Sequence, residues 1–156
     1  MLIAIFSIFI YFIFFELVEP QYIHLKNIDY NYIEDHMRCL TPLGSEERGF
    51  IINTPEELQI LEESKNAPFC DGIELPIIDF GTKTLLGRTT ISCGCSSTSS
   101  RGVYRDDKEK EIIYSIVIKS AGSCELAGTN GNWILIDKFP VDYKVRFETK
   151  YIGNAC

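Results

Sequence analysis

Six cysteines are the residues of this chain with the most evident capacity for chemistry. They are Cys39, Cys70, Cys93, Cys95, Cys124 and Cys156. Only Gly94 separates Cys93 from Cys95, and two thiolates this close could hold copper(I) or zinc, or form a redox pair. A closed zinc site needs four ligands, and no histidine follows His36. An even number of cysteines behind an apolar N-terminus instead favours structural disulfides.

Catalysis by a serine or cysteine nucleophile requires a histidine base. The chain has only His24 and His36, and both lie in a segment without a clear structural pattern. Its adjacent carboxylates are Asp106–Asp107, Glu56–Glu57 and Glu62–Glu63. All lie in a predicted turn or helix, where solvated acidic groups are expected, and no apolar surroundings would raise their pKa. The sequence therefore predicts no catalytic residues, no cofactor and no metal site.

Composition bounds the remaining classes of function. The chain has 156 residues, of which 46% are hydrophobic and 24% charged, so it can bury a core and form one domain. Its formal net charge of -7 would repel phosphate backbones, which argues against nucleic acid as a partner. Arg101 and Arg105 lie in and just after a polar stretch, Ser96–Gly102, that predicts a loop. We identify these two arginines as candidate partner-binding residues.

The N-terminus resembles a targeting segment. Leu2 to Phe15 is a run of fourteen residues that is apolar except for Ser7 and the hydroxyl of Tyr11. This length suits the core of a signal peptide and is short of the roughly 20 residues that span a membrane. We therefore predict that residues 1–18 are a signal peptide or an N-terminal membrane anchor, with cleavage left open. The rest of the chain is expected to be exported: periplasmic, envelope-associated or secreted.

One local signal predicts a helix over residues 55–64. Thr54 can act as the N-cap, Pro55 fits the first helical position, and Glu57 completes a capping box. Residues 19–46 carry few periodic signals and are predicted to be a linker or arm. The folded domain is placed at 47–156.

The remainder of the chain is strand-like. Short apolar or alternating runs occupy 48–52, 77–80, 84–91, 103–105, 111–119, 133–136 and 143–151. Gly81 or Gly87 could mark a bend or bulge, and 121–132 is a glycine-rich loop. The predicted fold class is α+β: a mostly antiparallel sheet of about six strands, sandwich- or barrel-like, disulfide-braced, with one packed helix.

The predicted topology also suggests disulfide partners. Alternate strands of an up-and-down meander end on the same side of a sheet, which brings Cys95 or Cys93 toward Cys124. A helix that returns across its preceding strand brings Cys70 back toward Cys39. We therefore favour Cys39–Cys70 and Cys95–Cys124. Cys93 and Cys156 are left to pair with each other or to stay free.

The order of these features resembles a known family. The relevant strings are NTPEEL (53–58), PIIDF (76–80), TLLG (84–87), YSIVI (114–118) and WILIDKFP (133–140), with Cys124 and a closing VRF (145–147). They resemble the PrcB-like C-terminal domain, which occurs in small exported or lipid-anchored bacterial proteins, over about residues 48–149. Where that family has a glycine-rich loop with an aromatic residue, this chain has Ser92–Cys95 and lacks the aromatic.

The resemblance implies a binding or accessory role, because the family takes its name from a protein associated with a protease. We therefore expect a non-enzymatic exported module that engages an envelope or secreted protein, such as a protease. Membrane contact is expected only through an uncleaved N-terminal segment. The alternative is a small enzyme, or a metal or redox protein, that uses Cys93-Gly94-Cys95.

Overall fold

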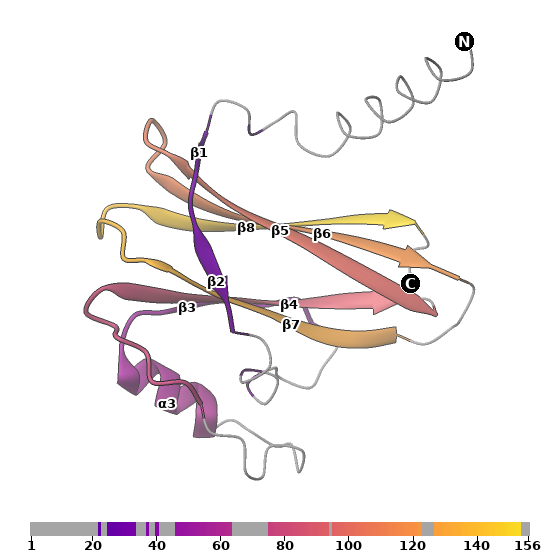
Figure 1. The fold of residues 1–156 in the computed structure, drawn as a ribbon, viewed down its shortest axis with the longest axis horizontal. Helices are drawn as coiled ribbons and strands as arrows, with labels where there is room; N and C mark the ends of the chain where they lie inside the picture. The colour runs from indigo at the N-terminus through magenta and orange to yellow at the C-terminus, as the bar shows by residue number, and fades with distance from the viewer. Residues whose placement is uncertain are drawn as a thin grey trace, which may run out of the picture.

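In the part of the chain that the computed structural model describes, eight strands form two stacked β-sheets with a shared core, and one short helix accompanies them (Figure 1). The structure describes residues 22, 25–33, 37, 40, 46–63, 75–93, 95–122 and 127–153. The described elements are β1 (Lys26–Asn27), β2 (Tyr30–Tyr32), β3 (Gly49–Ile52), α3 (Pro55–Glu63), β4 (Lys83–Cys93), β5 (Ser96–Asp106), β6 (Glu111–Ala121), β7 (Ala127–Asp137) and β8 (Lys144–Gly153).

Each sheet has four strands, in the orders β1-β5-β6-β8 and β2-β7-β4-β3. All pairings are antiparallel except that of β6 with β8, which is parallel. Strand β6 is central, as its two apolar faces predict. The mostly antiparallel strand content agrees with the sequence, although the strands number eight rather than about six.

The main core lies between the two sheets. Strand β6 places Ile112, Tyr114, Ile116 and Ile118 on its inner face, because residues two apart share one face of a strand. Leu86 of β4 and Ile134 and Ile136 of β7 meet them from the other sheet. The alternation of apolar residues along β6 therefore sets which face of this sheet is buried.

A second apolar cluster covers the outer face of the β2-β7-β4-β3 sheet. Its largest member is Trp133, which is 1% exposed and packs with Leu85, Ile52 and Phe80. Leu58 and Leu61 of α3 pack against this cluster, so the helix rests on a sheet as predicted. The run that starts at Trp133, expected to form a strand, thus places its largest side chain in this cluster.

The segment predicted to be a linker or arm takes part in both sheets. Strand β1 pairs with β5 and strand β2 pairs with β7. Farther along, Met37 and Leu40 are 0% and 2% exposed within the second cluster. This segment lacks an obvious pattern because its strands are two and three residues long, too short to show a period. Its described residues nevertheless belong to the folded unit.

The helix begins as its capping box predicts. The Thr54 hydroxyl accepts a hydrogen bond from the Glu57 backbone N–H at 3.2 Å, and the Glu57 carboxylate accepts one from the Asn53 N–H at 2.6 Å. The strand-like runs 103–105 and 111–119 lie within β5 and β6 and form a hairpin around the turn predicted at Asp106–Asp107. The Asp106 carboxylate accepts backbone N–H bonds from Lys108 and Glu109 at the turn.

Two local predictions are wrong, and a third holds at only one of its two alternative positions. Residues 77–80 do not form a strand, because Asp79 bonds its carboxylate to the Gly81 N–H and the Thr82 hydroxyl and folds the chain into a turn. Gly81 thus lies in a turn, but Gly87 marks no bulge: it pairs in register with Trp133. Residues 121–132 are not all loop either, since β7 begins at Ala127 and pairs with β4 along its whole length.

The polar stretch 96–102 is also misassigned by the sequence. It is the first part of β5, and every residue from 96 to 106 pairs with β6. Serine and threonine side chains suggest a loop, but the long apolar strand β6 supplies a partner for the whole stretch. Neighbouring structure thus overrides local propensity here.

Candidate functional site

The first half of β5 has a free side. Strand β1 pairs only with Tyr104 and Arg105 of β5, and one more bond runs from the Ile28 N–H to the Val103 carbonyl at 2.9 Å. No described strand lies beyond β5 over residues 96–100. We call this stretch, Ser96–Ser100, the open edge. In Figure 1, β1 crosses β5 near one end, and the rest of β5 runs on past it.

The bond from β1 shows which backbone groups of the open edge face outward. The Val103 carbonyl points toward β1, so odd-numbered residues of β5 direct their N–H and C=O groups away from β6, because this direction alternates along a strand. The Tyr30 hydroxyl donates to the Arg101 carbonyl at 2.7 Å, which agrees with this alternation. Ser97 and Ser99 therefore present outward donors and acceptors, while Ser96, Thr98 and Ser100 bond to β6.

The side chains of the open edge are small, uncharged and exposed. This is unusual for an edge strand, since charged residues or proline normally keep such edges from pairing with other chains. The edge at the other side of the same sheet carries that protection: β8 bears Lys144, Arg146, Glu148 and Lys150. The two edges of this sheet therefore differ in their readiness to accept another strand.

Arg101, predicted as a partner-binding residue, is held within the domain. Its Nε and an Nη donate to the Asn132 side-chain oxygen at 3.1 and 2.8 Å. The guanidinium also donates to the Ser99 hydroxyl at 3.0 Å and lies 5.2 Å from the Tyr32 ring centre. Arg101 thus links the two sheets through Asn132 of β7, which corrects its assignment to a loop.

Arg105 is likewise in a strand and has partners within the chain. It forms an ion pair with Asp107 and donates to the Tyr143 hydroxyl at 2.8 Å. It also stacks over the Tyr143 ring at 4.6 Å. Hydrogen bonds from Tyr143 and Arg105 lower the pKa of Asp107. The Arg105 side chain therefore bonds to residues of its own chain, next to the turn between β5 and β6.

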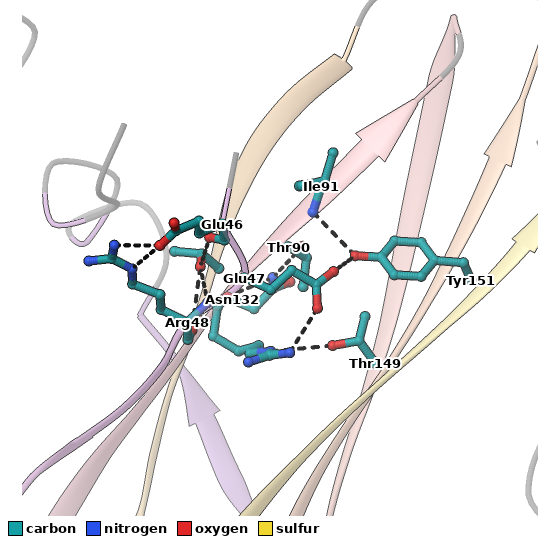
Figure 2. A network of polar contacts seen from close by, with 10 residues as sticks. Glu46, Glu47, Arg48, Thr90, Ile91, Asn132, Thr149 and Tyr151 are labelled. Carbon is teal, nitrogen blue, oxygen red and sulfur yellow. Dashed lines mark hydrogen bonds and ion pairs between the residues drawn. The ribbon is translucent and has the colours of Figure 1, made fainter. Parts of the chain in front are cut away.

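A polar network joins β4 and β8, which belong to different sheets (Figure 2). Arg88 forms an ion pair with Glu47 at 2.7 Å, and both side chains are largely shielded, with 18% and 26% exposure. The Tyr151 hydroxyl of β8 donates to the Glu47 carboxylate and accepts the Ile91 N–H at 3.3 Å. Desolvation, aided by the hydrogen bond to Glu47, raises the pKa of Tyr151 to about 12.

Two further side chains extend this network on the β4 side. The Thr89 hydroxyl bonds the Arg48 N–H at 2.6 Å and the Glu46 carbonyl at 3.0 Å. The buried Asn132 amide donates to the Arg88 carbonyl at 3.0 Å and to the Thr90 hydroxyl at 2.9 Å. These groups bond one another and connect the sheets, which is a structural role.

Cys93 and Cys95 are both disulfide-bonded, so neither presents a thiolate to a metal ion in this state. A disulfide is also the oxidised form of a redox pair, so the redox alternative stays a prediction. A methyl group added at Gly122 would lie 2.7 Å from the Cys95 sulfur, so Cys95 lies beside the chain that leads to Cys124. Cys39, Cys70, Cys124 and Cys156 lie outside the described residues. The favoured pairings, Cys39–Cys70 and Cys95–Cys124, therefore stay predictions.

The described part of the chain holds no group of three side chains able to ligate a metal, and no helix within it is long and apolar enough to cross a membrane. His24, His36 and the apolar run Leu2 to Phe15 lie outside the described residues.

No family model, curated protein or solved structure matches the chain. The resemblance to the PrcB-like domain therefore stays a prediction.

Sequence reasoning missed the open edge and the structural use of Asn132 and Tyr151. For the open edge the sequence offers only this: five uncharged residues, Ser96–Ser100, precede Arg101-Gly102 and the short apolar segment that starts at Val103. For Asn132 the signal is a polar residue directly before a buried run that starts at Trp133.

Proposed function

We propose that this protein is an exported, non-enzymatic binding or accessory module that accepts an extended segment of a protein partner at the open edge. One observation carries the proposal: the outward N–H and C=O groups of Ser97 and Ser99 have no strand partner among the described residues. A strand that lacks a neighbour can bind a peptide by adding it to the sheet.

The surrounding side chains support this choice of surface. Arg101 and Arg105 bond to Asn132 and to Asp107, and Glu47 bonds to Arg88 and Tyr151. The backbone of the open edge is thus the better candidate for recognition, with short serine and threonine side chains that leave a partner strand room to approach.

The class of partner rests on the N-terminus and on the resemblance. An apolar run at Leu2 to Phe15 favours export, and the PrcB-like pattern favours a protease or another envelope protein as the partner. A reporter that is active only outside the cytoplasm, fused to the C-terminus of the chain, is expected to be active. Activity of a reporter that works only inside the cytoplasm would contradict export.

We further propose that disulfides brace this module. Cys95 lies against Gly122, which supports the pairing Cys95–Cys124, and the strand register places Cys93 opposite Ala127 in the same region. Closing a loop of about 30 residues is worth somewhat over 3 kcal/mol in the chain-entropy account. Peptide mapping of the non-reduced protein is expected to recover Cys95–Cys124 and Cys39–Cys70. A Cys70–Cys124 peptide would contradict the pairing.

The binding role is tested by capture from the native envelope or secreted fraction. Ser97→Pro removes an N–H that points away from β6, so the β5–β6 ladder is retained, and proline is tolerated at such edge positions. Ser97→Ala is the matched control because it keeps that N–H. We expect the wild-type chain and Ser97→Ala to retain the same partner and Ser97→Pro to lose it at least tenfold. Equal capture by both variants would exclude the open edge as the binding surface.

A further inference from the structure

We propose that one occupant of the open edge is a second copy of this chain, paired antiparallel with the first around a two-fold axis at Thr98. The two β1-β5-β6-β8 sheets would then form one continuous sheet. The inference rests on the proposed function in taking the open edge as the binding surface, and it adds the identity of a partner.

The open edge has a defined length and a defined centre. On one side it ends at Ser100, because the outward carbonyl of the next residue, Arg101, already accepts a hydrogen bond from the Tyr30 hydroxyl. On the other side it ends where the chain enters β5 at Ser96. Thr98 lies at its midpoint. A second β5 centred on Thr98 would therefore cover the open stretch without displacing β1.

The sequence of the open edge is symmetric about the same residue. It reads Ser-Ser-Thr-Ser-Ser, so antiparallel pairing of two copies places like residues opposite one another: Thr98 opposite Thr98, Ser97 opposite Ser99, and Ser96 opposite Ser100. Serine and threonine pairs across strands can hydrogen-bond and are favourable. Such a two-fold arrangement uses the same surface on both copies, as most homodimers do.

The direction of the backbone groups fits this register. Ser97 and Ser99 carry the outward N–H and C=O groups, so Ser97 of one copy and Ser99 of the other would exchange two bonds on each side of the axis, about four bonds in all. Thr98 directs its own N–H and C=O toward β6. The two copies of Thr98 would therefore form the close type of pair, with Cα atoms about 4.5 Å apart.

Charge favours a second copy at this edge over self-pairing elsewhere. The chain carries a net charge of -7, and two copies repel each other in general. The open edge contains no charged residue, so the repulsion is least where the two copies would meet. At the outer edge of β8, by contrast, Lys144, Arg146, Glu148 and Lys150 disfavour pairing.

The contact would be small. About five residues from each copy fall below the size of standard stable interfaces, which places the pairing among weak, transient contacts. The dimer should therefore form in a concentration-dependent way. A cross-link that traps it is the appropriate readout.

Cysteine cross-linking of the full chain tests the register. In the Thr98→Cys variant the two new thiols meet on the axis at a separation that a disulfide can bridge. In the Ser100→Cys control, the new thiol points to the same side of the sheet but meets Ser96 of the other copy. The two control thiols lie about 14 Å apart along the strands. On a non-reducing gel we expect at least tenfold more cross-linked dimer from Thr98→Cys than from Ser100→Cys.

A second substitution separates strand pairing from random collision. Adding Ser97→Pro to Thr98→Cys removes outward donors from both copies and should lower cross-linking to the level of Ser100→Cys, whereas adding Ser97→Ala should not. Equal cross-linking of Thr98→Cys and Ser100→Cys, or no effect of proline, would overturn the inference. If cross-linking fails while capture of another protein stays sensitive to Ser97→Pro, the proposed function stands and the second copy is excluded as partner. If Thr98→Cys cross-links as expected but capture of another protein is insensitive to Ser97→Pro, the second copy stands as the occupant and the open edge is excluded as the surface that binds another protein.

Discussion

The bond between Arg101 and Asn132 provides the sharpest test of how the two sheets are held together. Asn132 is 1% exposed and accepts two hydrogen bonds from the Arg101 guanidinium, at 3.1 and 2.8 Å. Hydrogen bonds to a charged group contribute about 1.5–3 kcal/mol. Arg101→Ala should therefore lower the free energy of unfolding by about 2 kcal/mol.

Asn132→Ala should cost more, about 4 kcal/mol. It breaks the same contact with Arg101 and also leaves the Arg88 carbonyl and the Thr90 hydroxyl without the amide that bonds them. Each such neutral bond contributes about 1 kcal/mol. The double variant should be little worse than Asn132→Ala alone, because the shared contact can be lost only once. The coupling energy is thus expected to be at least about 1 kcal/mol.

The assay is denaturant unfolding of the disulfide-intact protein, with all four members of the cycle compared at one pH. The control cycle uses Lys83 and Asp137, which form an ion pair at 2.6 Å between the neighbouring strands β4 and β7 but are 35% and 83% exposed. That exposed pair should couple by no more than about 0.5 kcal/mol. Additive losses for Arg101 and Asn132 would refute the structural role of Arg101 and restore it as a candidate partner-binding residue.

Three further substitutions test other parts of the fold. Gly87→Ala would place a methyl carbon 2.1 Å from the buried Trp133 ring and should cost about 1–3 kcal/mol or more, while Gly128→Ala, whose nearest neighbour is 3.9 Å away, should stay within about 0.5 kcal/mol; equal losses would contradict the packing of the ring. Thr54→Ala removes the helix N-cap and should cost about 1 kcal/mol in denaturant unfolding, with Thr54→Ser nearly neutral; no difference between the two would contradict the cap. Because the pKa of Tyr151 rises from its ordinary value near 10 to about 12, the folded state holds that proton more tightly, so its contribution to stability is complete below pH 10 and is lost as the pH rises to 12. In an absorbance titration, Tyr151→Phe should lack one phenol that ionises near pH 12 in the wild-type protein. If the missing phenol is instead one that ionises near pH 10, the contacts of Tyr151 in the network are contradicted.

Elements governed by neighbouring residues were predictable from the sequence. The helix at Pro55–Glu63 follows from the Thr54 cap and the Glu57 carboxylate, which act within one turn of the chain. The hairpin around residues 106–111 follows from a charged turn between two strand-like runs. In both cases the decisive contacts lie a few residues apart, so the sequence contains them directly.

Elements governed by distant partners were not predictable. Ser96–Ser100 is extended because it pairs with β6. The short strands β1 and β2 form because they pair with β5 and β7. The parallel pairing of β8 with β6 likewise depends on a connection that passes through the other sheet. The open edge escaped detection for the same reason, since an edge is defined by which strands lie beside it.

The places where β1 and β2 dock constrain the order in which the chain can fold as it is made. Lys26 needs Arg105 and Tyr30 needs Ile136 before either can pair. At a synthesis rate of about 5–20 residues per second, the wait from Tyr30 to Ile136 lasts about 5–20 s. During that time Tyr30, Met37 and neighbouring residues have no sheet to cover them. The first-made strands of the domain therefore wait through most of synthesis before they can pair.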